Sequence, residues 1–301
     1  MSERWDIAGK RVVLTGATNG IGLAAARALV AAGARLAIVA RNAERAELAR
    51  AAINKAGGAT VDVLLADLSS QGEIRRLAAE IADRYPRLDV LANNAGATYG
   101  SRRQSVDGIE LTWAVNHLAP FLLTTLLVER LKSSAPARII TTASDAHLGA
   151  RIPFDDLDAR RRYRSFRRYG ETKLANILFT TELARRLAGT GVTANCYHPG
   201  LVATGFNRNN GVLMDAAMRV VRLFARSPEK GAETLVWLAT SSDVEDVTGG
   251  YFVDKRLAKP SAAAQDAVTA RQLWEVSERQ VAGAQSSAGP WPLERAADAA
   301  T

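Results

Sequence analysis

Short apolar runs recur along the chain, and each is followed by a polar or glycine-containing turn and then by a helical pattern. The runs that we predict to be strands are 11–15, 35–40, 61–66, 88–92, 137–144 and 192–197, with a last strand within 249–254. Runs of this length without an alternating polar face are typical of parallel strands buried on both faces. The predicted helices include 23–32, 106–131, 169–187, 228–240, 262–281 and one that Ser69 or Ser70 caps and that reaches Arg84. This alternation predicts an α/β fold, a single Rossmann-type doubly wound parallel sheet of about seven strands with helices on both faces.

The chain of 301 residues shows no internal repeat and no separate linker, so we expect one domain. Its dinucleotide-binding catalytic part is expected to span residues 1–260, with substrate loops at 145–168 and 205–227. The second loop is expected to contain a short helix, 211–224. Residues 261–301 are expected to form a C-terminal helix and a frayed tail.

A glycine-rich turn follows the first predicted strand. Gly16, Gly20 and Gly22 have the spacing G-x-x-x-G-x-G, with a strand before them and an alanine-rich helix after them. Such a turn lets the backbone approach a pyrophosphate closely, at the N–H groups of a helix N-terminus. A merely tight turn is the alternative, but three glycines in this context favour dinucleotide binding. The residues expected to contact the cofactor here are Gly16, Thr18, Asn19, Gly20, Ile21 and Gly22.

The residue after the second strand bears on which nicotinamide cofactor is bound. An acidic residue there would bind the ribose 2′-OH of NAD, whereas a basic residue accommodates the 2′-phosphate of NADP. Arg41 stands at this position, and the first acid, Glu44, lies within the next helix. We therefore expect NADP(H) rather than NAD(H), although an arginine that only caps the strand end remains the alternative. The other strand-end residues expected to line the cofactor cleft are Asp67, Leu68, Asn94, Ala95 and Gly96.

Tyr169 and Lys173 lie four residues apart on a predicted helix and hence on the same face. A free phenol has a pKa near ~10, and a neighbouring ammonium group lowers it. The pair is therefore a candidate proton donor near neutral pH. Two further residues suggest chemistry: Ser144 ends the fifth strand at the ligand edge, and Asn116 lies mid-helix among apolar residues, where asparagine is a poor helix former. A surface Tyr–Lys pair, a core-facing serine and a structural asparagine are the alternatives.

The net charge of +8 comes largely from one run, the arginines at 160, 161, 162, 164, 167 and 168. A local run of this kind favours a solvated loop or a site for an anionic ligand over nucleic acid or an anionic membrane. No stretch of about 18 uninterrupted apolar residues occurs, so we expect no membrane span. The N-terminus is charged where a secretory signal would be apolar, so a cytoplasmic location is expected.

The only cysteine, Cys196, excludes an intramolecular disulfide and fits a reducing compartment. It stands in an apolar run, which favours a packed core thiol over a nucleophile. The histidines and this cysteine show no paired spacing, so no metal site is predicted. We expect structural roles for His117 and His147.

Taken together, these stretches resemble the short-chain dehydrogenase/reductase family over about residues 8–255. The motifs that carry the resemblance, in the family's order, are Thr15-Gly16…Gly20-Ile21-Gly22, Asn93-Asn94-Ala95-Gly96, Asn116, Ser144, Tyr169…Lys173 and Pro199-Gly200. The segments 116–124, 169–179 and 198–200 are similar to the retinol dehydrogenase-like branch. Ala143 stands where a second serine is common, which leaves the catalytic position, Ser144, intact.

The resemblance implies a role for each of these residues. Tyr169 would donate a proton to the carbonyl oxygen during reduction and accept one from the alcohol during oxidation. Lys173 would lower the pKa of Tyr169 and bond the nicotinamide ribose, Ser144 would hydrogen-bond the reacting oxygen, and Asn116 would hold Lys173 through a water. The residues expected around the nicotinamide are Asn116, Tyr169, Lys173, Pro199, Gly200, Val202 and Thr204, of which the last would contact the carboxamide.

The predicted function is an NADP(H)-dependent oxidoreductase that interconverts a hydrophobic alcohol and its aldehyde or ketone. Apolar residues in and near the second loop favour a hydrophobic substrate, while the nearby arginines allow an anionic substituent: Leu201, Phe206, Val212, Leu213, Met214 and Met218. A catalytically silent NADP(H)-binding sensor or scaffold is the alternative. The resemblance further implies a soluble enzyme, because the membrane-anchoring N-terminal helix of many vertebrate members is not seen, and a homodimer or homotetramer.

Overall fold

The computed structural model describes residues 4–57, 61–202 and 226–282. Its centre is an eight-stranded sheet with the order β3-β2-β1-β4-β5-β6-β7-β8. The strands are β1 Arg11–Thr15, β2 Arg35–Ala40, β3 Asp62–Leu65, β4 Val90–Asn93, β5 Ala137–Thr142, β6 Val192–His198, β7 Tyr251–Val253 and β8 Arg256–Ala258. The order reverses direction at β1, where β4 pairs on the other side, and this doubly wound arrangement confirms the predicted α/β fold.

The strand predicted within 249–254 is β7, and β8 after it was not predicted. The pairing is parallel from β3 to β7, but β8 runs antiparallel to β7. Asp254 and Lys255 connect the two strands with positive φ angles of 49° and 61°. Such hairpin turns usually contain Asn-Gly or Asp-Gly, so the sequence Asp-Lys gave no turn signal.

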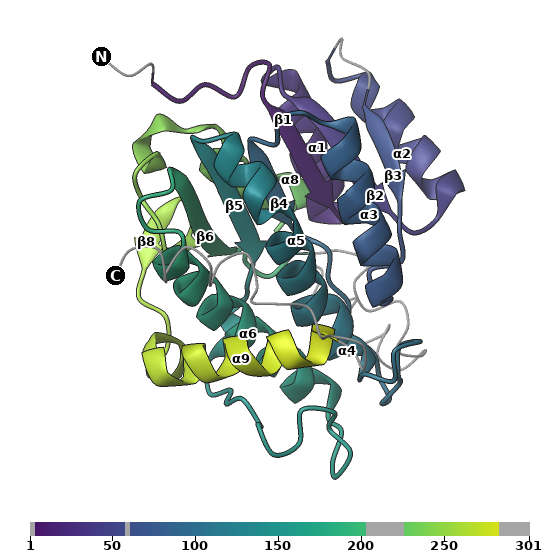
Figure 1. Cartoon of the computed structure of the whole chain (residues 1–301). Coiled ribbons are helices and arrows are strands. Elements are labelled where there is room, and N and C mark those ends of the chain that lie inside the picture. The colour runs from purple at the N-terminus through teal and green to yellow at the C-terminus, as the bar shows by residue number, and fades with distance from the viewer. Residues whose placement is uncertain (1–3, 58–60, 203–225, 283–301) are drawn as a thin grey trace.

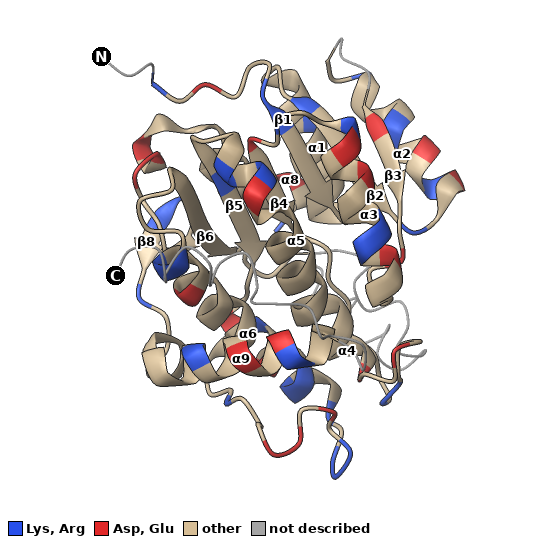
Figure 2. Ribbon diagram, viewed as in Figure 1, with Lys and Arg blue, Asp and Glu red and all other residues tan. Residues whose placement is uncertain are grey.

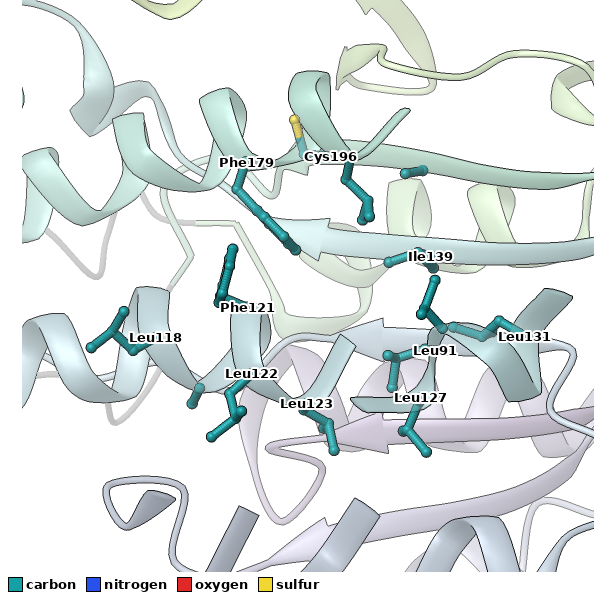
Figure 3. Packing of buried hydrophobic residues seen from close by; sticks show 14 of the residues in the cluster. Leu91, Leu118, Phe121, Leu122, Leu123, Leu127, Leu131, Ile139, Phe179 and Cys196 are labelled. Atoms are coloured by element: carbon teal, nitrogen blue, oxygen red, sulfur yellow. The ribbon is translucent and has the colours of Figure 1, made fainter. Parts of the chain in front are cut away.

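Helices cover both faces of the sheet (Figure 1). One face carries α1 Gly20–Ala31, α2 Ala43–Asn54 and α8 Pro228–Thr240, and the other carries α3 Gln71–Arg84, α5 Ala119–Ser133, α6 Ser165–Arg186 and α9 Ala267–Ala282. Two hydrophobic clusters fill the corresponding layers. In the larger cluster, Phe121 of α5 packs against Phe179 of α6 with ring centroids 5.5 Å apart (Figure 3).

The long helix predicted over 106–131 begins later and is not uniform. Residues before Leu111 form turns, with Gly108 at φ 76°. The helix then consists of α4 Leu111–Trp113, a π-helical turn η1 Ala114–Leu118, and α5. Glu110 sets the start, because its carboxylate accepts hydrogen bonds from the N–H groups of Thr112 and Trp113.

By length and hydropathy alone, the continuous stretch Leu111–Ser133 is apolar enough to cross a membrane. However, 83% of its most apolar window is buried inside the fold, as in a core helix, so the stretch is weak evidence for a membrane span.

The predicted C-terminal helix is divided into a 3-10 turn, η5 Ala262–Gln265, and α9, because Asp266 between them is extended. α9 packs across α6, and its Leu273 and Trp274 belong to the larger hydrophobic cluster. Predictions that lie outside the described residues are the helix 211–224, the apolar residues of the second loop from 206 to 218, the frayed tail and the cofactor contact of Thr204.

Candidate active site

The glycine turn between β1 and α1 is too tightly packed for side chains. A Cβ atom at Gly22 would lie 2.1 Å from the carbonyl oxygen of Gly16, and one at Gly16 would lie 2.8 Å from the Cα of Ala95. Gly16 and Gly20 have φ angles of 70° and 50°, a region that favours glycine. Asn19, at the N-cap of α1, makes no capping hydrogen bond with its side chain among the described residues. The N–H groups of this first turn therefore suit a phosphate group.

Asn94 and Thr15 fix this turn against the end of β4. The Nδ2 of Asn94 donates to the carbonyl oxygens of Thr15 and Gly16, at 3.0 and 3.3 Å. The Oγ1 of Thr15 accepts from the backbone N–H groups of Asn94 and Ala95, at 2.9 and 3.0 Å. The side chain of Asn94, predicted to line the cofactor cleft, thus shapes the glycine turn.

The segment after β6 meets the same turn at the start of α8. A Cβ atom at Gly231 would lie 2.6 Å from the Cγ2 of Val202 and 3.1 Å from the Cγ1 of Ile21. Val202 and Ile21, which were both predicted to contact the cofactor, therefore pack against Gly231. Gly200, with φ at 82°, turns the chain after Pro199 towards this contact.

Arg41 and Asp67 follow the ends of β2 and β3, at the side of the sheet predicted for the adenosine. Both act on the phenol of Tyr99, a residue that the sequence did not single out. Burial raises the pKa of Tyr99, the positive charge of Arg41 opposes this shift, and the negative charge of Asp67 adds to it. Tyr99 follows Gly96, a predicted cofactor-binding residue, by three positions in the segment after β4, and that nearness was the available signal. Leu68 and Ala95 line one small cavity nearby.

Ser144, Tyr169 and Lys173 come together at the carboxyl edge of β5. The side chains of Ser144 and Tyr169 are hydrogen-bonded to each other. The Nζ of Lys173 donates to the carbonyl oxygen of Thr142 at 2.8 Å and lies 5.4 Å from the centre of the Tyr169 ring. Lys173 is 2% exposed, whereas Tyr169 keeps part of its surface open.

The electrostatics of this pair correct one expectation. Burial raises the pKa of Tyr169 to about 12, and the hydrogen bond from Ser144 opposes that rise. Burial also lowers the pKa of Lys173 to about 7. The pKa of Tyr169 is therefore shifted upwards, opposite to the direction that the sequence suggested, because burial outweighs the influence of the neighbouring Lys173.

Asn116 lies in the π-helical turn η1 and is 1% exposed. Its Nδ2 donates to the carbonyl oxygen of Ala97 at 2.9 Å, and its Oδ1 accepts from the N–H of Ala97 at 2.8 Å. A Cβ atom at Gly96 would lie 3.5 Å from this Oδ1 and 3.8 Å from the Nζ of Lys173. Asn116 therefore holds the segment after β4 close to the lysine. π-Helical turns within helices are frequent at functional sites.

Two of the three histidines, His117 and His147, make buried structural contacts. His117 packs 4.6 Å from the Trp113 ring and is hydrogen-bonded to Ser277 of α9 at 2.9 Å. The Nδ1 of His147 lies 2.8 Å from the carbonyl oxygen of Ser144, while its Nε2 accepts from the N–H of Ser261 at 3.1 Å. Within residues 4–57, 61–202 and 226–282, no group of three or more His, Cys, Asp or Glu residues is placed to hold a metal ion.

The arginine run divides into two kinds of residue. Arg160 pairs with Asp158 and Arg161 pairs with Asp155 on the exposed loop before α6, where Figure 2 shows basic and acidic residues side by side. Arg168, at the end of the run, is instead 1% exposed. The prediction of a solvated loop therefore fits the first part of the run and is wrong for Arg168.

This chain is similar to a known protein family, to individual proteins and to solved structures. The profile of the family described as short chain dehydrogenase matches residues 10–212. A protein of Streptomyces sp. (strain C5), named as a candidate daunorubicin C-13 ketoreductase, DnrU, is 44% identical over 91% of this chain and 93% of its own length. Retinol dehydrogenase 14 of Mus musculus is 42% identical, over 91% of this chain and 86% of its own length. The Pseudomonas aeruginosa RhlG/NADP active-site complex superimposes with a TM-score of 0.67 at 27% identity, covering 88% of this chain and 100% of RhlG.

Proposed function

Because this chain belongs to the short-chain dehydrogenase family, we propose that it interconverts a hydrophobic alcohol and its aldehyde or ketone, with NADP(H) as cofactor and Tyr169 as general acid/base. The observation that carries the proposal is the meeting of Ser144, Tyr169 and Lys173 at the sheet edge that also bears the glycine turn. A catalytic group and a phosphate cradle on one edge suit a reaction on a bound dinucleotide.

The nicotinamide, when bound, supplies or takes up the hydride, so the protein must position the substrate and move one proton. During reduction, the phenol of Tyr169 donates its proton to the substrate oxygen. The hydroxyl of Ser144 donates a second hydrogen bond to the same oxygen and stabilises the charge that develops there. In the reverse direction, the phenolate form of Tyr169 accepts the proton of the alcohol.

Lys173 is suited to return the proton to Tyr169. A group whose pKa is about 7 is present in both protonation states near neutral pH, which is the condition for efficient proton exchange. The carbonyl oxygen of Thr142 fixes the position of its Nζ. Asn116 and Gly96 lie beside Lys173 and keep the strand end in place.

NADP(H) is proposed over NAD(H) because Arg41 is exposed at the end of β2 and can pair with a 2′-phosphate. The RhlG structure, which is an NADP complex, supports this choice. The names of the two relatives, a ketoreductase and a retinol dehydrogenase, support an alcohol–carbonyl substrate pair.

The test is NADPH oxidation by the purified protein with aliphatic, aromatic, terpenoid and steroid carbonyls, and the expected result is turnover with at least one of the hydrophobic classes. NADPH binding is measured in parallel by fluorescence. Tight NADPH binding without turnover on any carbonyl, and without NADP reduction by the matching alcohols, would instead identify a silent nucleotide-binding protein.

A further inference from the structure

Arg168 precedes Tyr169 in α6 and makes buried contacts that the proposed reaction does not explain. Its Nε donates to the Oε2 of Glu110 at 2.7 Å, and its Nη1 donates to the Oε2 of Glu171 at 3.1 Å. Its Nη2 donates to the backbone oxygen of Leu157 in the loop before α6. The guanidinium group is therefore bound by three different parts of the chain.

Glu110, the main partner, also organises the start of the helix that leads to Asn116. It is fully buried, and its two oxygens accept from the N–H groups of Thr112 and Trp113, both at 2.9 Å. The central carbon of the Arg168 guanidinium group lies 4.7 Å from the centre of the Trp113 ring. One ion pair thus joins the first turns of the two helices that carry Asn116 and Tyr169.

A buried ion pair contributes little net stability, because desolvation of both charges offsets their attraction. The pair does fix the relative positions of the residues that it joins, since the N–H groups of the planar guanidinium donate hydrogen bonds only in set directions. The neighbouring Arg167 provides a contrast. It pairs with the Oε1 of Glu171 at 3.0 Å but is 68% exposed, where water screens the interaction.

We infer that Arg168 is a positioning residue: its pair with Glu110 holds the phenol of Tyr169 in register with Asn116 and Lys173. The inference rests on the proposed function. Loss of the pair frees the first turn of α6 and the loop at Leu157 to shift. A misplacement of about 1 Å at a reacting group costs on the order of 10²-fold in rate.

The experiment compares Arg168→Met, Arg168→Lys and the control Arg167→Met with the wild type. For each protein, kcat and KM for a carbonyl reduced by the wild type, the dissociation constant for NADPH and the thermal midpoint are measured. Kinetics are recorded well below every midpoint, so that only folded protein contributes. Arg168→Lys keeps the charge without the three-way fork and guards against a methionine variant that fails to fold.

The expected result is a kcat about 10- to 100-fold lower in Arg168→Met, with a smaller loss in Arg168→Lys. Because Tyr169 and Lys173 face the nicotinamide end, NADPH should also bind several-fold more weakly. Arg167→Met should match the wild type within about twofold in every value. A purely structural role would lower the midpoints of the Arg168 variants and leave kcat and NADPH binding of the folded protein at wild-type values, which would overturn the inference.

Failure of the proposed function is separable from failure of this inference. A wild type that reduces no carbonyl counts against the function, and NADPH binding then decides the role of Arg168. If the wild type turns over and folded Arg168→Met keeps the wild-type kcat and NADPH binding, the result counts against the inference alone. Arg168→Lys takes its place in this comparison if Arg168→Met does not fold.

Discussion

Replacing Gly22 by alanine tests whether the turn after β1 binds the cofactor. Alanine in a helix is favoured over glycine by about 1 kcal/mol, so propensity alone predicts a stabilised protein. The new Cβ atom, however, would lie 2.1 Å from the backbone oxygen of Gly16 and 2.7 Å from the Nδ2 of Asn94, whereas real Cβ contacts essentially never fall below 3.0 Å. Because that oxygen belongs to the backbone, the turn itself must move.

Overpacking of this kind costs about 1–3 kcal/mol. If the turn relieves the clash by leaving its phosphate-binding geometry, the same energy is lost from binding. NADPH should then bind about 10- to 100-fold more weakly, since about 1.4 kcal/mol corresponds to tenfold. Fluorescence titration with NADPH measures this change, and thermal unfolding shows whether the variant is folded.

Gly72→Ala is the matched control, because Gly72 also lies in the first turn of a helix, α3. Its Cβ atom would have only the Oγ of Ser70 nearby, at 3.8 Å. This variant should bind NADPH like the wild type and unfold at the same or a slightly higher temperature. The reasoning would be refuted if Gly22→Ala had the same NADPH affinity and the same thermal midpoint as Gly72→Ala.

Two further predictions concern charge. Arg41→Asp should shift cofactor preference from NADP towards NAD, measured as the ratio of the two kcat/KM values, and a wild type that already prefers NAD would show the 2′-phosphate argument to be wrong. For Lys173, burial lowers the pKa from 10.5 to about 7, so the unfolded chain binds more protons between these values and stability should rise with pH across that window. Urea unfolding at about pH 7 and about pH 9 measures the free energy of unfolding, and Lys173→Met should lose the rise between these two pH values. The same rise in Lys173→Met as in the wild type would contradict this prediction.

The fold was predictable where burial alone determines the pattern. The strands β1, β2 and β5 are almost wholly buried because helices cover both faces, and the consecutive apolar residues that this burial requires are visible in the sequence. Helix starts were less predictable. The start at Leu111 depends on the Glu110 carboxylate, and a residue of this type is equally common inside helices.

The candidate site was predictable as far as its residues are close in sequence or stand at strand ends. Tyr169 and Lys173 are one helical turn apart, and Ser144 follows β5 directly. The burial of Arg168 was not visible, because it stands in a run of exposed arginines and its partner Glu110 lies 58 residues away. The pKa values were misjudged for a similar reason: sequence spacing shows that a charge is near, but not how much water is excluded around it.

The measurement that tests the central claim most directly is the rate of NADPH oxidation by Tyr169→Phe, on a carbonyl that the wild type reduces. Tyr163→Phe is the control, because the Tyr163 hydroxyl is hydrogen-bonded to the backbone oxygen of Tyr99, at 2.8 Å, and to the Oγ1 of Thr112, at 3.1 Å, and has no part in the proposed proton transfer. Tyr169→Phe should lose at least about 10²-fold in kcat while binding NADPH nearly as tightly as the wild type, and Tyr163→Phe should keep most of its activity. Wild-type turnover by Tyr169→Phe would contradict the assignment of Tyr169 as the proton donor.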